Sequence, residues 1–259
     1  MAIDKINGIA FDSIANLNGV AKASIANFNG QDAPSAAGIV TDNLFQNYDA
    51  GNASSYGGSG TTWTDLQGNY NVELIGGPTY VSSTPAHFDF DLVNDRAQGA
   101  TNYSASSNDM TVEVWWRADN ISSTRRYSLT AAFESNFSNR RFLLNIERGR
   151  RMRFRCDNAT GTIGALITTA TFSAGTWYCV CATKSGTTST IYVNGASSTS
   201  MTLSSSTLGT CNVFGIAERQ LGSPDLYDGD ISIVRIYNDA LTASEVSQNF
   251  DAVKSNFGY

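Results

Sequence analysis

The sequence predicts an all-β protein: a sandwich or jelly roll of many short strands, with one short C-terminal helix and an extended N-terminal arm. Short stretches in which apolar and polar residues alternate recur along the 259 residues, whereas long apolar helical stretches are missing. Apolar residues make up 41% of the chain, which is enough for a core, and 23 glycines supply turns. Three evenly spaced Asn-Gly pairs open the chain.

An eleven-residue repeat occupies residues 1–34. Its turn pairs are Asn7-Gly8, Asn18-Gly19 and Asn29-Gly30. Eleven residues is also the period of a right-handed coiled coil, but Gly costs about 1 kcal/mol inside a helix and Asn-Gly is a strong turn signal. Each unit is therefore predicted to form a short extended piece, a tight turn and a second extended piece.

The repeat has too few apolar residues to bury itself, so we expect it to lie on a larger surface. That surface is the chain's own globular domain, a sister subunit or another protein, and a mobile tail is the alternative. We predict an assembly arm anchored by Ile6, Leu17 and Phe28. The predicted domains are the arm at 1–34, a linker at 35–43 and a jelly roll at 44–259.

The strongest strands follow from alternation or from short apolar runs. They are predicted at Met110–Trp116, Arg141–Ile146, Met152–Arg155, Trp177–Ala182, Thr190–Val193 and Ile231–Tyr237. One helix is predicted near the C-terminus. It begins with the capping box Thr242-Ala243-Ser244-Glu245, after which Val246, Phe250 and Val253 share one face.

The four cysteines do not form a dense disulfide framework, so free buried thiols are predicted. A metal–thiolate pair at Cys179 and Cys181 is the alternative. The first residues lack a basic start followed by an apolar run, which predicts no secretion signal. No stretch approaches the roughly 18 apolar residues needed to cross a bilayer, so no membrane contact is predicted.

The net charge is −6, yet residues 117–155 hold ten of the seventeen basic side chains and three acids. On a strand, alternate arginines of this segment would line one face, with Met152 and Phe154 on the other. The predicted charged interface comprises Arg148, Arg150, Arg151, Arg153 and Arg155.

Three partners suit this interface: an acidic neighbour in an assembly, an anionic polysaccharide or nucleic acid. Salt bridges within the same sheet are the alternative. Nucleic acid is the least favoured of the three and is not predicted as a partner, because the net charge is negative and only Phe154 interleaves with the basic residues.

Four phrases, in order along residues 44–258, resemble the laminin-G-like branch of the concanavalin A-like lectin/glucanase superfamily. The phrases are Tyr48–Asn52 with Ser59–Leu66, Thr111–Trp116, Thr176–Tyr178 with Ile191–Gly195, and Asp228–Ile231 with Val234–Asn238. The resemblance implies a two-sheet antiparallel jelly-roll sandwich, and it leaves the function open.

Several members of that superfamily hold a structural calcium with acidic and backbone oxygens. The resemblance therefore implies Asp49, Asp228 and nearby Asp230 as candidate calcium ligands, with simple solvation as the alternative. Sugar binding needs an exposed aromatic platform beside polar side chains. The candidates are Tyr56, Trp63, Trp115 and Tyr227, with packing under a loop as the alternative for each; Trp116 and Trp177 are predicted to be core.

The glucanase branch of the superfamily carries E-x-D-x-x-E on one strand, and its paired carboxylates act as nucleophile and acid/base. This motif is missing here. Glu113 has no second carboxylate two residues away, and the single histidine, His87, is predicted to be an ordinary strand residue rather than part of a Ser/His/Asp triad. No enzymatic activity is predicted.

The tandem phrases Ile6–Ala10 and Leu17–Ala21 resemble N-terminal segments of virion structural proteins of tailed bacteriophages, notably cyanophages. There they precede sandwich domains on head decorations or tail fibres. The resemblance implies a virion surface protein, assembled in the host cytoplasm, whose arm binds other virion proteins. Its jelly roll would stabilise the particle or contact host surface polysaccharide. A symmetric homo-oligomer is expected, and we predict a trimer.

Two other function classes stay open. One is a cellular carbohydrate-binding or adhesion module. The other is a glycan hydrolase whose carboxylates come together from distant strands. The sequence does not decide between a head and a tail location.

Overall fold

The structure is a computed structural model. It describes residues 38–103, 108–135, 140–219 and 226–259, together with six short strands in the first 37 residues. The chain divides into two compact units, Met1–Gly38 and Ile39–Tyr259.

The first unit contains three antiparallel hairpins in phase with the repeat. They pair β1 (Lys5–Ile6) with β2 (Ile9–Ala10), β3 (Asn16–Leu17) with β4 (Val20–Ala21), and β5 (Asn27–Phe28) with β6 (Gln31–Asp32). Two residues connect each pair, which is the loop length that Asn-Gly favours. The predicted order of extended piece, turn and extended piece is confirmed. The predicted anchors Ile6, Leu17 and Phe28 each end the first strand of a hairpin, and their side chains lie outside the described residues.

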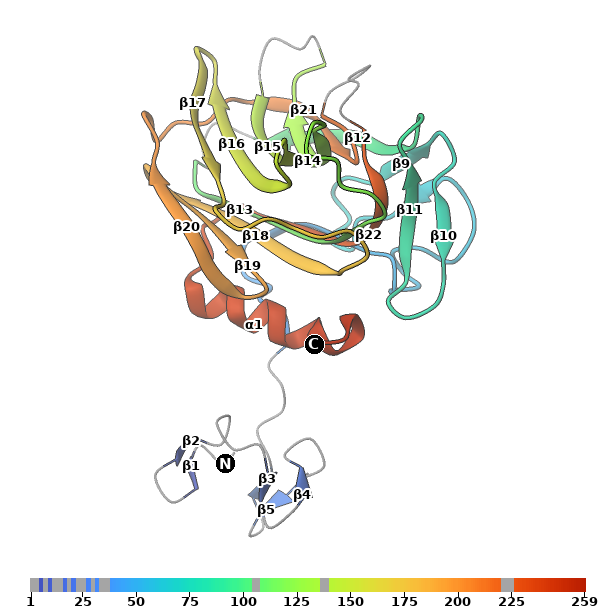
Figure 1. The fold of residues 1–259 in the computed structure, drawn as a ribbon, viewed down its shortest axis with the longest axis vertical. Coiled ribbons are helices and arrows are strands. Elements are labelled where there is room, and N and C mark those ends of the chain that lie inside the picture. The colour runs from blue at the N-terminus through green and yellow to red at the C-terminus, as the bar shows by residue number, and fades with distance from the viewer. Residues whose placement is uncertain are drawn as a thin grey trace. The chain divides into compact units, whose positions relative to one another are not determined.

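The second unit is built from two eight-stranded antiparallel sheets (Figure 1). The first sheet runs in the order β10-β11-β22-β13-β18-β19-β20, with β7 also pairing with β22. Its strands are β7 (Leu44–Asp49), β10 (Thr79–Val81), β11 (His87–Asp91), β13 (Met110–Ala118), β18 (Tyr178–Ser185), β19 (Thr188–Val193), β20 (Ala196–Thr202) and β22 (Asp228–Tyr237).

The second sheet runs in the order β17-β16-β15-β14-β21-β12-β9-β8. Its strands are β8 (Thr62–Trp63), β9 (Val72–Ile75), β12 (Arg96–Tyr103), β14 (Tyr127–Phe133), β15 (Arg140–Glu147), β16 (Arg151–Asn158), β17 (Gly161–Ile167) and β21 (Cys211–Ile216). All the predicted strands are present, and the predicted two-sheet antiparallel jelly-roll class is confirmed.

The core lies between the two sheets. Val112, Val114 and Trp116 of β13 face it from the first sheet, and Phe154 of β16 faces it from the second. Because side chains alternate along a strand, the arginines of β16 point to the opposite side of the second sheet, as the sequence predicts.

The helix α1 (Ala243–Val253) begins with the predicted capping box, in which the Thr242 and Glu245 side chains bond each other's backbone N–H groups. A turn of 3-10 helix, η3 (Lys254–Phe257), follows it. Together they cover part of the outer face of the first sheet, the face turned away from the core (Figure 1). The covered face includes Trp115, whose ring stacks on Phe250 and Phe257 with centroids 5.5 and 3.8 Å away.

A buried ion pair ties α1 to the sheet. Arg235 Nη1 donates to Glu113 Oε1 at 2.5 Å, and both side chains are at most 2% exposed. Asn249 of α1 donates its Nδ2 to the other carboxylate oxygen at 2.8 Å and to the Tyr237 hydroxyl at 2.9 Å. Both carboxylate oxygens of Glu113 thus accept a hydrogen bond, as a buried carboxylate requires.

The segment before β7 belongs to the jelly roll. Ile39 and Val40 pack against buried residues of the first sheet, and Val40 N donates to Asn249 Oδ1 at 2.8 Å. Residues 39–43 of the predicted linker therefore belong to the second unit, in which Ile39 and Val40 cover apolar surface.

All four cysteines are free and buried, as predicted. Burial raises the pKa of Cys156 and of Cys211 to about 12, so these thiols stay protonated at neutral pH. Neither α1 nor any other helix of the described ranges combines the length and the apolar character of a membrane span.

Candidate functional site

The predicted sugar platforms are all buried. Trp115 is 0% exposed because α1 and η3 cover it. Tyr56 (7%) and Trp63 (0%) pack with Phe88 in the core, where the Tyr56 and Phe88 centroids are 4.8 Å apart. Tyr227 is 0% exposed and packs near Phe90. The prediction of an exposed platform at these four residues is wrong. Trp116 is core as predicted, whereas Trp177 keeps part of its ring exposed.

The three acids predicted to bind calcium do not form one ligand set. Asp228 and Asp230 lie two residues apart on β22. Asp49 pairs instead with Ile233, three residues further along β22 than Asp230, or about 10 Å at 3.3 Å per residue.

Asp230 also has other partners. Arg117 donates its Nε to Asp230 Oδ2, and His87 Nε2 lies 3.2 Å from Asp230 Oδ1. In the part of the chain that the structure describes, no three His, Cys, Asp or Glu side chains have the arrangement of a metal site. The prediction that Asp49, Asp228 and Asp230 bind one calcium ion together is therefore wrong, and calcium binding elsewhere on the chain stays a prediction.

The basic interface is split between paired and free arginines. Arg148, Arg150 and Arg151 are exposed. Arg153 bonds Glu147, and Arg155 Nε donates to Asp157 Oδ1 at 2.7 Å. The alternative of salt bridges within the sheet thus holds for two of the five.

Glu147 is the acid at the centre of this interface. Burial alone would raise the pKa of Glu147, but hydrogen bonds from Arg126, the Arg148 backbone and Arg153 hold it below its usual value. The carboxylate therefore stays charged and neutralises part of the basic interface.

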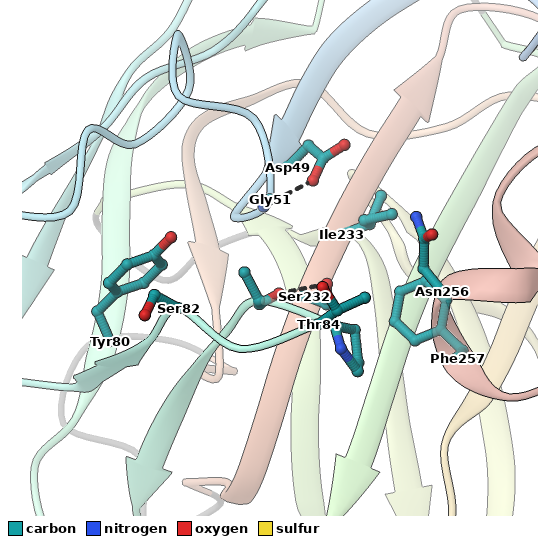
Figure 2. A pocket seen from close by; sticks show the side chains of 11 residues that line it. Asp49, Gly51, Tyr80, Ser82, Thr84, Ser232, Ile233, Asn256 and Phe257 are labelled. Carbon is teal, nitrogen blue, oxygen red and sulfur yellow. Dashed lines mark hydrogen bonds between the residues drawn. The ribbon is translucent and has the colours of Figure 1, made fainter.

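A pocket opens on the outer face of the first sheet, next to η3 (Figure 2). Its volume is about 220 Å³. This lies below the roughly 300–1,000 Å³ of drug-sized sites and suits a single small polar ring. The pocket is lined by Asp49, Gly51, Tyr80, Ser82, Thr84, Pro85, Ala86, Ser232, Ile233, Asn256 and Phe257.

Four segments distant in sequence build the pocket. The end of β7 and the turn after it supply Asp49 and Gly51, and β22 supplies Ser232 and Ile233. The connection from β10 to β11 supplies Ser82, Thr84, Pro85 and Ala86. Asn256 and Phe257 come from η3, on the side of the pocket away from Tyr80, as Figure 2 shows.

Hydrogen bonds hold these segments in place. Ser232 Oγ donates to the Ala86 carbonyl at 2.6 Å, and the Tyr80 hydroxyl donates to the Ala50 carbonyl at 3.1 Å. Gly51 N donates to Asp49 Oδ1 at 2.9 Å, which fixes the carboxylate. A Cβ on Gly51 would lie 3.3 Å from that same oxygen, so glycine gives the carboxylate its room.

Several polar groups of the lining remain unused. Ser82, Thr84 and Asn256 are exposed, and their side chains make no hydrogen bond within the described residues; Asp49 Oδ2 makes none there either. The pocket thus presents two hydroxyls, one amide and one carboxylate oxygen to solvent. These groups can donate to and accept from a hydroxyl-rich ligand.

Beside the pocket, a second polar cluster uses the only histidine. His87 follows the lining residues Pro85 and Ala86, and its Nδ1 lies 2.6 Å from the Pro85 carbonyl. Its ring meets Trp177 edge-on at 5.5 Å, and Trp177 in turn meets Phe257 of the lining at 5.2 Å. His87 lies on β11 as predicted, and it braces the pocket wall.

Sequence reasoning found one lining residue, Asp49, and assigned it to calcium. The serines and threonines of 82–84 carry no distinctive spacing in a chain that is dense in both. The run of Ser and Thr at 82–84 before Pro85 predicts a loop. That this loop lies next to β7 and η3 follows only from the fold.

Comparison with known proteins supports the same architecture. A protein-family profile described as "Concanavalin A-like lectin/glucanases superfamily" matches residues 93–247. Among proteins of curated function, no sequence matches the chain.

Solved structures of similar fold include a sialidase and two toxin domains. A Trypanosoma rangeli sialidase in complex with 2,3-difluorosialic acid matches at TM-score 0.62 and 15% identity, over 90% of this chain and 36% of that one. The receptor-binding domain of botulinum neurotoxin type G matches at 0.62 and 12%, over 81% and 51%. The binding domain of Paraclostridial mosquitocidal protein 1 matches at 0.62 and 20%, over 80% and 52%.

This chain therefore spans only about a third to a half of the length of these solved chains. At such identities the likeness concerns the fold. That fold is one that binding domains of toxins also use.

Proposed function

We propose that this chain, which belongs to the concanavalin A-like lectin/glucanases superfamily, is a non-enzymatic surface protein of a bacteriophage virion. Its N-terminal arm attaches it to the particle, and its jelly roll binds a glycan of the host surface. The pocket carries the glycan-binding part of this proposal, and the repeat carries the virion part.

The pocket supports glycan binding through its chemistry. It is open to solvent and of the size of one sugar ring. Three of its polar side chains, Ser82, Thr84 and Asn256, make no hydrogen bond within the described residues. Sugars are recognised by such convergent hydroxyl, amide and carboxylate groups around a small apolar wall, which Phe257 and Ile233 supply here.

A substitution at the mouth of the pocket tests this. Ser82→Trp fills the entrance, and we expect it to weaken binding of the full chain to its best ligand by at least about tenfold. The measurement is a bacterial polysaccharide array followed by calorimetry. The matched control is Ser83→Trp, which adds the same ring to the neighbouring exposed residue outside the lining. Equal binding by both variants, with equal melting temperatures, would contradict the pocket as the site.

The non-enzymatic part of the proposal has its own readout. Incubation of the full chain with every polysaccharide that it binds should release no reducing ends. Release of reducing ends by the purified chain would favour the hydrolase alternative instead.

The arm supports attachment through its repetition. Three equal hairpins, each of two-residue strands, bury too little to be stable alone, since an isolated two-stranded hairpin is marginal in water. The repeated phrases Ile6–Ala10 and Leu17–Ala21 resemble N-terminal segments of virion structural proteins. A partner surface, in the particle or in a sister subunit, would complete them.

Removal of residues 1–34 tests the arm. We expect the full chain to form an oligomer, with a trimer as our prediction, and the truncated chain to be a folded monomer, because the jelly roll is a compact unit by itself. Light scattering on both gives the masses, and circular dichroism checks the fold. Identical monomers would count against self-assembly through the arm and would favour a cellular adhesion module.

A further inference from the structure

The charge of the pocket is one-sided. Its eleven lining residues include one carboxylate, Asp49, and no Lys, Arg or His. The nearest buried cation, Arg235, is committed to Glu113 at 2.5 Å. A ligand in the pocket therefore meets negative charge that no lining cation offsets.

More acids lie along the same outer face of the first sheet. Beyond Ser232 on β22 come Asp230 and Asp228, and the neighbouring strand β11 carries Asp89 and Asp91 opposite them. Asp119, just after β13, adds a further exposed acid. Burial, and then the neighbouring charge of Asp119, raise the pKa of Asp89 and of Asp228.

The basic side chains on this face lie beside acids. Arg117 bonds Asp230, and His87 lies against the same carboxylate. Lys254 of η3 donates to Asp251 at 2.6 Å, and Arg125 lies near Asp228. The face is thus negative as a whole, and it repels an anionic ligand over the approach as well as in the pocket.

The carboxylate of Asp49 is positioned to accept hydrogen bonds from the hydroxyl groups of a neutral ligand. Its Oδ1 is held by Gly51 N, and its Oδ2 makes no hydrogen bond within the described residues. An ionised carboxylate is a hydrogen-bond acceptor only, so it accepts hydrogen bonds from hydroxyl groups and has no donor for another carboxylate or a sulfate. A fixed acceptor also loses little entropy when the ligand binds.

We propose that this pocket selects the terminal ring of a neutral hexose polysaccharide and rejects rings that carry a carboxylate or sulfate. The inference rests on the proposed glycan binding and adds the ligand class. Asp49 accepts from the ring hydroxyls, and Ser82, Thr84 and Asn256 supply the remaining hydrogen bonds. The basic interface on the second sheet, with exposed Arg148, Arg150 and Arg151, is the competing location for an anionic glycan.

Matched pairs of neutral and acidic sugars test the selection. The probes are methyl glycosides of glucose, galactose and mannose, together with the corresponding glucuronide, galacturonide and mannuronide, titrated into the full chain by NMR at low and high salt. We expect each uronide to bind at least about tenfold more weakly than its neutral partner at low salt. The gap should narrow at high salt as charges are screened.

Two variants locate the effect. Asp49→Asn keeps the Oδ1 acceptor for Gly51 N, so the fold is retained, and it should weaken neutral binding while closing the gap to the uronides. The control is Asp42→Asn, which removes the same charge from an exposed residue outside the lining and should leave both affinities unchanged.

The other outcomes separate the two proposals. Uronides that bind as tightly as neutral sugars, or that lose affinity on the triple change Arg148→Ala, Arg150→Ala and Arg151→Ala, would overturn neutral selection while glycan binding stands. A chain that binds none of the six glycosides and none of the arrayed polysaccharides would overturn both.

Discussion

Replacing Arg235 by Met is expected to lower the free energy of unfolding by about 3–5 kcal/mol. The change leaves the Glu113 carboxylate buried without its cation. The free-energy cost of removing this charge from water is then no longer offset by attraction to Arg235. Asn249 can still donate one hydrogen bond, which compensates only in part. Urea unfolding followed by tryptophan fluorescence measures the loss.

The double variant Glu113→Leu/Arg235→Met distinguishes the effect of an unpaired buried charge from the effect of altered packing at these positions. With both charges gone, much of the stability should return, since an apolar replacement of a buried ion pair is often neutral. The comparison is Lys254→Ala, which breaks an exposed pair with Asp251 and should cost less than about 1 kcal/mol. Equal losses for Arg235→Met and Lys254→Ala would refute the interpretation.

Glu218→Gln is expected to stabilise the protein at pH 8 and to have little effect at pH 5. The Glu218 side chain is 1% exposed, and Arg96 Nε lies 3.4 Å from its Oε1. Among the residues that the structure describes, Glu218 Oε2 has no hydrogen-bond partner. Burial raises the pKa of Glu218 to about 7, with Arg96 opposing the shift.

The sign follows from proton linkage. Because the folded-state pKa is raised above the unfolded value of 4.5, the unfolded chain releases this proton first. Stability is therefore full below about pH 4.5 and falls as the pH rises to about 7, by up to about 3 kcal/mol. Glutamine stays neutral, so the gain at pH 8 should be about 1–3 kcal/mol.

Urea unfolding at both pH values measures this gain. Glu73→Gln serves as the control, because it makes the same change at an exposed position of β9 in the same sheet. A constant difference between Glu218→Gln and the unchanged protein from pH 5 to pH 8 would rule out titration of Glu218 as the cause.

The sequence predicted the strands that have a dense or clearly alternating apolar pattern, and it missed strands in which that pattern is absent or interrupted. Met110–Trp116 and Ile231–Tyr237 carry dense apolar residues and lie in β13 and β22. β12 reads RAQGATNY and does not alternate. β14 reads YSLTAAF, in which the alternation of residues 127–130 ends in the apolar run Ala131–Phe133, and register shifts interrupt the pairing of both strands. At Gly99 of β12, a Cβ would lie 2.2 Å from the Asn71 carbonyl oxygen.

Exposure was harder to predict than strand position. Alternation along β13 puts Trp115 on the face away from the core, but it cannot say what covers that face. The cover, Phe250 and Phe257, comes from more than a hundred residues later. The pocket was missed for a similar reason, because its polar residues meet only through the fold.

The three hairpins of the arm have a kinetic consequence. Five residues separate one hairpin from the next. If the arm binds a partner surface as proposed above, docking of one hairpin holds its neighbours near their own positions at high effective concentration. Weak single contacts then combine into a long residence time, and release requires all three to let go together. Chains that lack one or two repeats should dissociate progressively faster, although every remaining contact is unchanged.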